Sequence, residues 1–352
     1  GDSSASEIEL DVREPNPYVT LSKDYVIDPG KTMAVKPLKE NGKAKLELSS
    51  IPPIDLSRRL EYLVRYPHGC IEQITSGAFP QLYLPSVVEC DANMLQDIDR
   101  NVKSVLSRLG SYQLSDGAFA YWSGNTSRSE WGTVYATHFL IEAAKHGYGV
   151  DRAMLDRALK YLRSNPSDYY LTQAYTQYVL ALNGTPTRGA MNQLREKAAS
   201  LSSDAKWLLA AYALDGNRKV AEGLISLCVD NAEKANPYDG TYNSDERRMS
   251  ISLMTLTILG RREEAFRMAL KMSDILKKDR WLSTQSTAWM LSTLSNFAVA
   301  GQNGIDATAG RELVKTDKSI ASMPLAAPTE VRNNGSGSLY AVVSQSLSLI
   351  HI

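Results

Sequence analysis

The sequence predicts a mainly α fold in which helical hairpins close into an α6/α6 toroid, with a small discontinuous antiparallel β region on either side of it. Three observations lead to this prediction. Apolar residues recur at helical spacing from Asp55 to about Ala300. Within that stretch, uncharged helices alternate with charged ones. Strand-like alternation is confined to the two ends of the chain.

The composition indicates a globular protein that does not bind nucleic acid. The chain has 352 residues, of which 43% are hydrophobic, enough for one large domain or two unequal ones. Lys plus Arg equals Asp plus Glu at 39 each, and no basic cluster is dense enough to follow a phosphate backbone. No membrane span is indicated, and we expect no cofactor and no metal. The N-terminal residues lack the apolar core of a signal peptide, so any targeting segment is expected upstream.

The cysteine content indicates chemistry rather than a disulfide scaffold. Three cysteines are too few to cross-link a chain of this length with a set of disulfides. If Cys70 reacts as described below, Cys90 and Cys228 remain as either a disulfide pair or two buried thiols. We favour two buried thiols.

The β region is expected in two pieces. Residues 17 to 50 alternate like strands and are interrupted by turn signals at Asp28-Pro-Gly and Glu40-Asn-Gly. Strand-like residues return from Val331 to Val343 around a glycine-rich turn. The apolar tail Ser346 to Ile352 ends abruptly and is expected to be a truncation or a cloning remnant.

The central stretch is expected to hold helices near residues 55-66, 70-84, 92-109, 130-146, 151-164, 168-183, 187-201, 203-215, 217-233, 246-260, 262-278 and 283-299. Asp151 to Ser164 carries Arg and Lys, whereas Tyr169 to Leu182 has no charge, so the first must face water and the second must be enclosed. Glycines that suit a left-handed helix end follow four of the uncharged helices, at Gly147, Gly184, Gly216 and Gly260. Six hairpins favour a closed ring, although the periodicity alone also allows an open superhelix.

The most informative motif is the octad Tyr66-Pro-His-Gly-Cys-Ile-Glu-Gln73. Gly69 and Cys70 stand between a proline turn and an apolar run, so Cys70 is expected near an exposed helix N-terminus. Unpaired amides there favour the thiolate. The carboxamide of Gln73 lies one turn further on. Attack by the sulfur on that carboxamide would expel ammonia and leave an internal thioester, an acyl group held ready for a later nucleophile.

The octad resembles the thioester region of the alpha-2-macroglobulin and complement family, most closely its bacterial members. Many relatives have Gly-Cys-Gly-Glu-Gln, whereas Ile71 replaces the second glycine here, as a bulky residue often does in bacterial members. The segments Gln113 to Trp122 and Thr284 to Met290 are also similar to thioester-domain sequence. The likeness covers most of residues 1 to 347.

This resemblance implies a domain organisation and a function. The implied organisation is a CUB-like β segment at 1-52, an α/α-toroid thioester domain at 53-302 and the second CUB-like segment at 303-352. The implied function is endopeptidase inhibition without turnover: in the parent protein, cleavage of a bait region unmasks the thioester, which then attaches the protease through its lysine amines. The implied partners are proteases and other macroglobulin domains of the same chain, and the implied location is the periplasm or cell surface.

Further residues of the octad have open roles. Tyr66 matches a position whose tyrosine shields the thioester in bacterial members, or it is an ordinary core tyrosine. Glu72 either orients the carboxamide or only favours the helix N-terminus. His68 is near Cys70 in sequence, and His138 is on an enclosed helix that can face the same end of the toroid; we interpret both as structural. No histidine occupies the context of the complement acyl-transfer residue, so direct attack by amines is expected.

Two other classes of function remain open at the level of the sequence. One is a binding or structural toroid whose thioester is absent or inactive. The other is a toroid enzyme such as a terpenoid cyclase, whose glutamine-tryptophan repeats the segment Gln113 to Trp122 also resembles. Cyclases of that kind need an aspartate-rich motif, and Asp97-Ile-Asp-Arg is only half of one. The zinc-binding residues of prenyltransferases cannot be assembled from this sequence.

Overall fold

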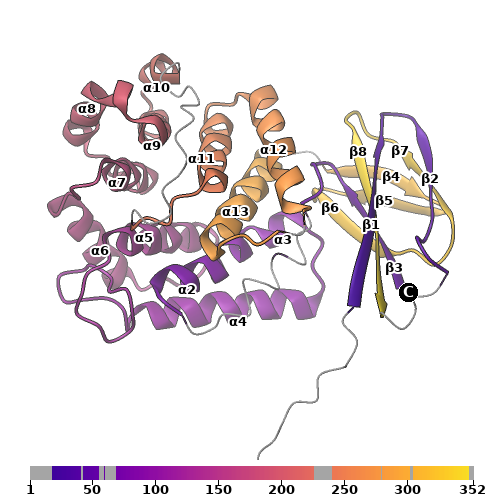
Figure 1. Ribbon diagram of the computed structural model, residues 1–352, viewed down its shortest axis with the longest axis horizontal. Coiled ribbons are helices and arrows are strands. Elements are labelled where there is room, and N and C mark those ends of the chain that lie inside the picture. Colours follow the sequence, from indigo (N-terminus) through magenta and orange to yellow (C-terminus); the bar gives the residue numbers. More distant parts are fainter. Residues whose placement is uncertain are drawn as a thin grey trace, which may run out of the picture. The chain divides into compact units, whose positions relative to one another are not determined.

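The computed structural model describes residues 18–40, 43–54, 59, 69–225, 240–278, 280–301 and 304–348. The chain forms two compact units, each drawn in Figure 1. The β unit comprises Gly1–Ser50, Gly304–Thr316 and Ile320–Ile352, and the helical unit comprises Ile51–Asn303 and Asp317–Ser319. Two segments far apart in the sequence therefore build one unit. Its assignment to the CUB-like class stays a prediction.

The β unit consists of two four-stranded antiparallel sheets, with strand orders β1-β8-β3-β6 and β2-β7-β4-β5. The strands are β1 (Tyr18–Ile27), β2 (Thr32–Val35), β3 (Lys43–Ser49), β4 (Ile305–Ala309), β5 (Glu312–Thr316), β6 (Ile320–Pro324), β7 (Thr329–Asn333) and β8 (Leu339–Ser348). Strand β3 lies between β6 and β8, and β2 pairs with β7. Alternate residues such as Leu46, Leu48, Val331 and Val343 form one apolar core from both sheets.

The β unit confirms some of the predicted strands and corrects others. The strands flanking the glycine-rich turn are β7 and β8. Strands β4 to β6 have no counterpart in the prediction, although Ile305–Ala309 alternates between buried and half-buried residues. The interpretation of the tail as a remnant is wrong for its first three residues. Ser346, Leu347 and Ser348 pair with β1, and Leu347 is buried.

The helical unit follows the predicted helices closely. They are α2 (Ile71–Ala78), α3 (Leu84–Val87), α4 (Ala92–Leu109), α5 (Glu130–Lys145), α6 (Arg152–Ser164), α7 (Tyr170–Leu182), α8 (Arg188–Glu196), α9 (Ser202–Leu214), α10 (Arg218–Leu224), α11 (Asp245–Ile258), α12 (Arg262–Leu276) and α13 (Thr284–Gly301), with 3-10 turns η1 (Phe79–Leu82) and η2 (Ala198–Ser200). The predicted helix near 55-66 lies outside the described residues except for Arg59, and the prediction for 217-233 extends into an undescribed segment.

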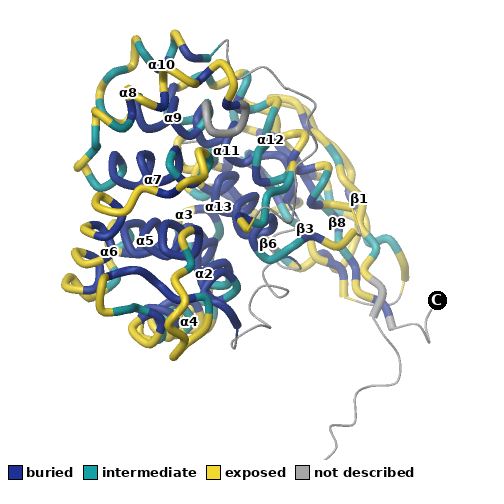
Figure 2. Tube along the Cα trace, turned by 60° about the vertical axis from the view of Figure 1, so that its left-hand side comes forward, coloured by how far each residue is buried: buried dark blue, intermediate teal, exposed yellow. Residues whose placement is uncertain are grey.

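Six helices form a closed ring. Helix α2 packs on α5, α5 on α7, α7 on α9, α9 on α11, α11 on α13, and α13 returns to α2. The charged helices α4, α6, α8, α10 and α12 each pack on the outside of this ring. Figure 2 shows the inner helices mostly buried and the outer ones exposed along one side. The ring confirms the predicted toroid, and the open superhelix is excluded because α13 closes against α2.

Burial explains why the charge pattern predicted this arrangement. Nine of the thirteen residues of the uncharged α7 are buried, whereas α6 buries only one apolar stripe that includes Leu155 and Leu159. The glycines expected to end helices all have positive φ: Gly147 at 84°, Gly184 at 73°, Gly216 at 78° and Gly260 at 66°.

The largest local departure is the predicted helix 70-84. It is divided into α2, η1 and α3 because Pro80 and Pro85 lack the N–H groups that a continuous α-helix requires. The predicted helix 187-201 similarly ends as α8 followed by η2.

Contacts between helix starts and short connections together fix the direction of the inner helices. Short connections run from α5 through α6 to α7, from α7 through α8 to α9, and from α11 through α12 to α13, which makes the inner helices of each series parallel. Trp131 and Arg247 join the first turns of α5 and α11, and Glu72 and Thr284 join those of α2 and α13. The inner helices are therefore parallel to one another. Their N-termini all lie at one end of the toroid, which is the end that carries the octad.

Candidate functional site

Cys70 is the N-cap residue of α2, with extended backbone angles of φ −65° and ψ 168°. The sequence places it at this helix start, but the expectation of an exposed helix end is wrong, because Cys70 is only 2% exposed. Burial raises the pKa of its thiol, and the neighbouring charge of Glu72 raises it further. Donors in Tyr121 and in the backbone lower the pKa of the thiol, but by less than burial raises it.

Gln73 folds back over Cys70. Its Oε1 accepts a hydrogen bond from the Cys70 N–H at 3.2 Å, and the Cys70 side chain faces the N–H of Gln73 in a reciprocal capping box. Gly69 makes room for this fold, because a Cβ at residue 69 would lie 2.5 Å from Gln73 Oε1 and 2.8 Å from its Cβ. The sulfur and the carboxamide are thus held together at one helix end.

Ile71 anchors the first turn of α2. Its side chain is buried, and its Cγ2 lies 2.5 Å from the place that a Cβ on Gly132 of α5 would occupy. Its N–H donates to the carbonyl of Tyr121 at 2.9 Å. The bulky residue at this position of the octad is therefore accommodated by a glycine on the neighbouring inner helix.

Two tyrosines that the sequence analysis did not single out complete the surroundings of Cys70. The hydroxyl of Tyr121 lies beside the Cys70 side chain and lowers the pKa of its thiol, and the hydroxyl of Tyr242 donates to that of Tyr121 at 2.8 Å. Burial, followed by the hydrogen bond to Cys70, raises the pKa of Tyr121, so its hydroxyl keeps its proton at neutral pH. Tyr121 belongs to the segment Gln113 to Trp122, whose likeness to family sequence was the one available signal.

Glu72 connects α2 to α13. Its carboxylate accepts hydrogen bonds from Ser76 Oγ at 2.6 Å and from Thr284 Oγ1 at 3.0 Å. Burial raises its pKa. The contacts of Glu72 thus join the first and last helices of the ring, and they account for the second family-like segment, which begins at Thr284.

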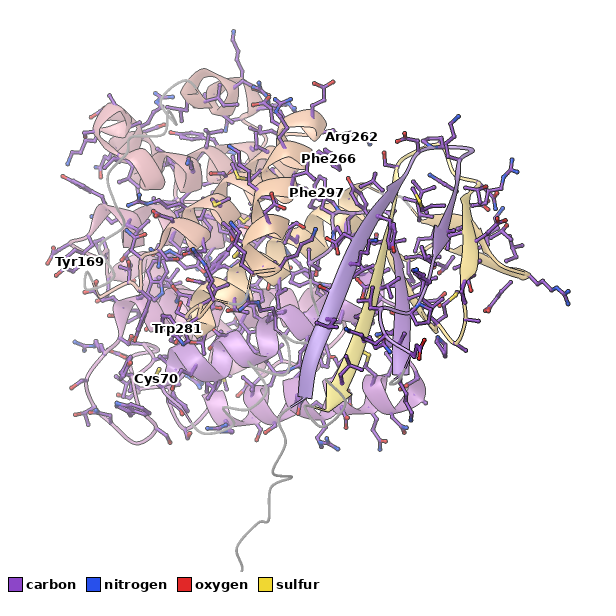
Figure 3. All side chains as sticks on the ribbon, turned by 45° about the vertical axis from the view of Figure 1, so that its right-hand side comes forward. Cys70, Tyr169, Arg262, Phe266, Trp281 and Phe297 are labelled. Atoms are coloured by element: carbon purple, nitrogen blue, oxygen red, sulfur yellow. The ribbon has the colours of Figure 1, made fainter. Side chains whose placement is uncertain are left out.

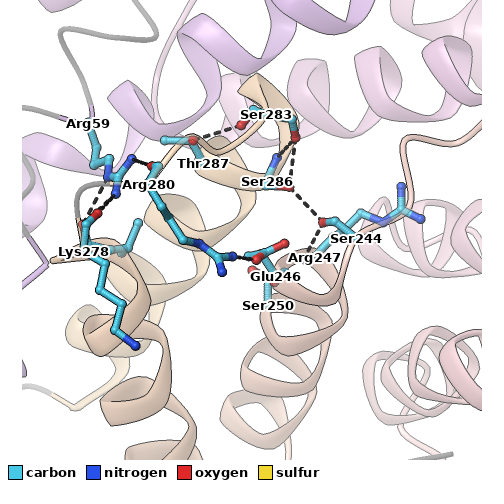
Figure 4. A network of polar contacts seen from close by, with 11 residues as sticks. Arg59, Ser244, Glu246, Arg247, Ser250, Lys278, Arg280, Ser283, Ser286 and Thr287 are labelled. Atoms are coloured by element: carbon cyan, nitrogen blue, oxygen red, sulfur yellow. Dashed lines mark hydrogen bonds and ion pairs between the residues drawn. The ribbon is translucent and has the colours of Figure 1, made fainter. Parts of the chain in front are cut away.

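A polar network fixes the starts of α11 and α13, beside the segments that carry Tyr242 and Thr284 (Figure 4). Ser244 Oγ and Ser286 Oγ are 2.8 Å apart, and Arg280 forms an ion pair with Glu246. The buried Arg247 hydrogen-bonds to Thr241 and to Gln285 Oε1, and its guanidinium lies 4.4 Å from the ring centroid of Trp131. Two neighbouring inner helices are thereby tied to the loop that carries Tyr242.

A family model, curated relatives and solved structures all relate this chain to the alpha-2-macroglobulins. The A-macroglobulin TED domain matches residues 48–169. The alpha-2-macroglobulin of Escherichia coli K12 is 28% identical over 313 residues, which cover 79% of this chain and 19% of that protein. The chain thus resembles bacterial alpha-2-macroglobulins over most of its length. It spans about a fifth of the length of this curated relative.

Solved structures of bacterial alpha-2-macroglobulins share the fold. Native E. coli alpha-2-macroglobulin, from domain MG7 to the C-terminus, superposes with a TM-score of 0.68 at 24% identity and covers 96% of this chain and 58% of that one. Salmonella alpha-2-macroglobulin reacted with methylamine gives a TM-score of 0.69 at 25% identity and covers 94% of this chain and 24% of that one.

Of the four histidines, the structure describes His138 and His146. His68, like Tyr66, lies outside the described residues, so the role of each stays a prediction. His138 is buried in the second half of α5, where its ring contacts Phe79 beyond the end of α2 and its Nδ1 lies 2.9 Å from Tyr175 Oη. It therefore does not face the Cys70 end of the toroid, contrary to one expectation. His146 is the C-cap of α5.

A cavity of about 260 Å³ lies inside the toroid, away from Cys70. Its walls include Phe79, His138, Trp289 and one carboxylate, Glu142, which already accepts hydrogen bonds from Tyr83 and Lys145. The half-motif beginning at Asp97 instead lies on the exposed face of α4, where Asp97 pairs with Arg100 at 2.6 Å. The arrangement of a cyclase site is thus not reproduced.

The Cys70 end of the toroid presents large aromatic side chains to solvent. Trp122 follows Tyr121, Tyr169 is the N-cap of α7, and Trp281 precedes α13 with 78% of its surface exposed. Figure 3 labels Cys70, Tyr169 and Trp281. A nucleophile that approaches this end from solvent meets aromatic surface.

Two further observations concern the described residues only. None of their helices combines the length and apolarity needed to cross a bilayer. They contain no group of three or more His, Cys, Asp or Glu side chains placed to hold a metal ion.

The other two cysteines are described only in part. Cys90 is a free, partly buried thiol, and Cys228 lies outside the described residues.

Proposed function

We propose that Cys70 and Gln73 form an internal thioester and that this chain is the thioester-bearing part of a bacterial protease-trapping alpha-2-macroglobulin. The observation that carries the proposal is the folded-back Gln73, whose carboxamide is held against the N-cap residue Cys70 by the hydrogen bond at 3.2 Å. Holding two reacting groups in contact removes much of the entropic barrier to their reaction.

The chemistry is an acyl transfer within the chain. The Cys70 sulfur attacks Gln73 Cδ, the C–N bond breaks, and ammonia leaves with a proton from solvent. The product is an acyl-thiol enclosed by Gly69, Ile71 and the aromatic residues at this end of the toroid. Enclosure lengthens its lifetime because water is kept from the acyl carbon. Tyr66 is proposed to contribute to the same shield.

The bond is proposed to capture proteases through their lysine amines. Amine attack on Gln73 Cδ would leave a stable amide and release the Cys70 thiol, so each molecule reacts once and does not turn over. Among the described residues, His138 in the second half of α5 and His146 at its C-cap lie away from the Cys70 end, so direct attack by the amine is favoured over histidine-mediated transfer. Bait cleavage, the other macroglobulin domains and a periplasmic or cell-surface location are proposed for the parent protein from the resemblance to alpha-2-macroglobulins.

The test is the intact mass of the freshly purified chain under denaturing conditions. We expect a mass lower than that of the plain sequence by one ammonia. Methylamine should then add its own mass and expose a new thiol at Cys70. Cys70→Ala should lack both effects, whereas Cys90→Ala should keep them. A full mass, no response to methylamine and an unmodified Gln73 in peptide mapping would reject the thioester and favour the binding-module alternative.

A second variant tests the geometry directly. Gly69→Ala places a Cβ within 2.5 Å of Gln73 Oε1 and should displace the carboxamide from Cys70. We expect the variant to fold but to lack the mass deficit. Gly189→Ala, whose new Cβ meets nothing within 4 Å, is the matched control and should keep it.

A further inference from the structure

Two hydroxyl groups beside Cys70 form a directed chain of donors. Tyr242 donates to the Tyr121 oxygen at 2.8 Å, which leaves the Tyr121 proton for the Cys70 sulfur. Hydrogen bonds in such a chain polarise one another, so the final donor is strengthened. Forming a thioester uses the sulfur and the carboxamide and does not explain why two tyrosines converge on the sulfur.

Tyr121 is placed by the backbone, independently of its hydroxyl group. Its carbonyl accepts the Ile71 N–H at 2.9 Å. Tyr112, earlier in the same segment, donates its hydroxyl to the Gly69 carbonyl at 2.7 Å. The segment is therefore attached on both sides of Cys70, and the Tyr121 side chain is held beside the sulfur.

Tyr242 is held in an unusual backbone conformation. Its φ is 55°, and it is the one non-glycine residue with positive φ in the part of the chain that the structure describes. This region is unfavourable for an L-residue other than glycine, so the surrounding structure must impose the conformation. Arg247 does so through its hydrogen bonds to the preceding Thr241. The backbone is thus held in a costly conformation that brings the Tyr242 hydroxyl to Tyr121.

We infer that Tyr121 is a catalytic residue that donates a hydrogen bond to the Cys70 sulfur as the C–S bond of the thioester breaks, with Tyr242 as its positioning residue. The inference rests on the proposed thioester. In the step concerned, the amine nitrogen bonds to Gln73 Cδ and the C–S electron pair passes to sulfur. The proton lost by the nitrogen passes to solvent or to the sulfur, and Tyr121 keeps its own.

The surroundings of Cys70 explain why the departing sulfur needs a donor. A thiolate in this buried position is disfavoured by desolvation and by the nearby carboxylate of Glu72. Negative charge develops on the sulfur as it leaves, and a hydrogen bond aimed at that atom stabilises the transition state more than the neutral thioester. The same bond assists the reverse step, because thioester formation also proceeds through the thiolate.

A tyrosine that only shields the thioester would behave differently. Phenylalanine keeps the ring and removes the hydroxyl group, so Tyr121→Phe separates the two roles. The kinetic experiment measures the rate at which methylamine releases the Cys70 thiol from the intact chain. We expect Tyr121→Phe to lower this rate about 10- to 100-fold, as for loss of a hydrogen bond to a charged group. Tyr242→Phe should lower it less, and the control Tyr25→Phe on β1 of the β unit should leave it unchanged.

A second measurement does not require the thioester. In Gln73→Ala, Cys70 stays a thiol, and the rate of its alkylation by iodoacetamide against pH gives its pKa. Adding Tyr121→Phe should raise that pKa by about one unit, adding Tyr242→Phe should raise it by less, and adding the control Tyr25→Phe should not change it.

The two measurements separate the inference from the proposed function. Absence of the mass deficit in the unmodified chain rejects the thioester, and the pKa measurement still decides whether Tyr121 acts on the sulfur. The inference is overturned if Tyr121→Phe leaves the methylamine rate within about twofold and the thiol pKa within about 0.3 unit of the parent values, because one lost hydrogen bond should exceed that range. It is also overturned if Tyr121→Phe accelerates the methylamine reaction.

Discussion

The contact between Ile71 and Gly132 makes a quantitative prediction about the octad. Gly132→Ala would place a Cβ 2.5 Å from Ile71 Cγ2, with Ser129 Oγ at 2.7 Å as a second neighbour. Overpacking of this kind costs about 1 to 3 kcal/mol. Alanine recovers about 1 kcal/mol of helix propensity, so a net loss of up to about 2 kcal/mol of unfolding free energy is expected.

The same substitution should behave differently once Ile71 is shortened. Ile71→Ala alone should cost about 2 to 5 kcal/mol, because the side chain is buried. In that background Gly132→Ala should stabilise the chain by up to about 1 kcal/mol through helix propensity, since the Cγ2 that it would strike is gone. The two substitutions should therefore couple by about 1 to 3 kcal/mol in a double-mutant cycle.

The assay is urea unfolding of the four chains, followed by far-UV circular dichroism. Gly189→Ala is the control for helix propensity, because it lies on the outer helix α8 with open space around its new Cβ. It should stabilise the chain by up to about 1 kcal/mol whether residue 71 is Ile or Ala. Additivity of Ile71→Ala and Gly132→Ala within about 0.5 kcal/mol would refute the reasoning.

Three further predictions concern stability. In urea unfolding, Leu180→Ala on the inner helix α7 should lower the unfolding free energy by about 2 to 5 kcal/mol, because this side chain is buried. Leu270→Ala on the outer helix α12 should lower it by less than about 0.5 kcal/mol, because Leu270 is partly exposed. Equal losses would contradict the assignment of α7 as inner and α12 as outer. Burial lowers the pKa of His138 from 6.5 to about 4, so between pH 6.5 and pH 4 the His138 ring binds a proton in the unfolded chain but not in the folded one. Its contribution to the unfolding free energy should therefore fall by up to about 3 kcal/mol as pH drops from about 6.5 to 4, and His138→Phe should flatten that part of the pH profile. Burial raises the pKa of Glu72, so its contribution falls as pH rises, and Glu72→Gln should raise the melting temperature more near pH 8 than near pH 4.

The sequence was sufficient for features that depend on local pattern. The absence of charge in Tyr170–Leu182 predicted an enclosed helix, and the helix-ending glycines predicted the hairpins, because both signals act within a few residues. Strands β4 to β6 were missed because each is only five residues long and polar residues such as Asp306 and Lys315 interrupt their apolar pattern.

The site was predictable only in part, for a physical reason. Cys70 and Gln73 are three residues apart, so the spacing itself brings them together at a helix start. Tyr121 lies beside Cys70 because the segment between α4 and α5 packs on the start of α2, and Tyr242 reaches Tyr121 from the loop before α11. No local pattern reports either contact. The burial of Cys70 was missed for the same reason, since segments distant in the sequence cover the helix end.

Closure of α13 against α2 has a consequence for biosynthesis. The ring joins the earliest and latest described helices of its unit, and Glu72 meets its Thr284 partner only across that seam. A nascent chain that has emerged as far as α11 carries Cys70 and Gln73 but has no closed ring around them. On the proposed function, the reactive bond therefore matures after the chain has been made through α13. The order of translation thus delays formation of the thioester until the closed ring that excludes water from it has formed.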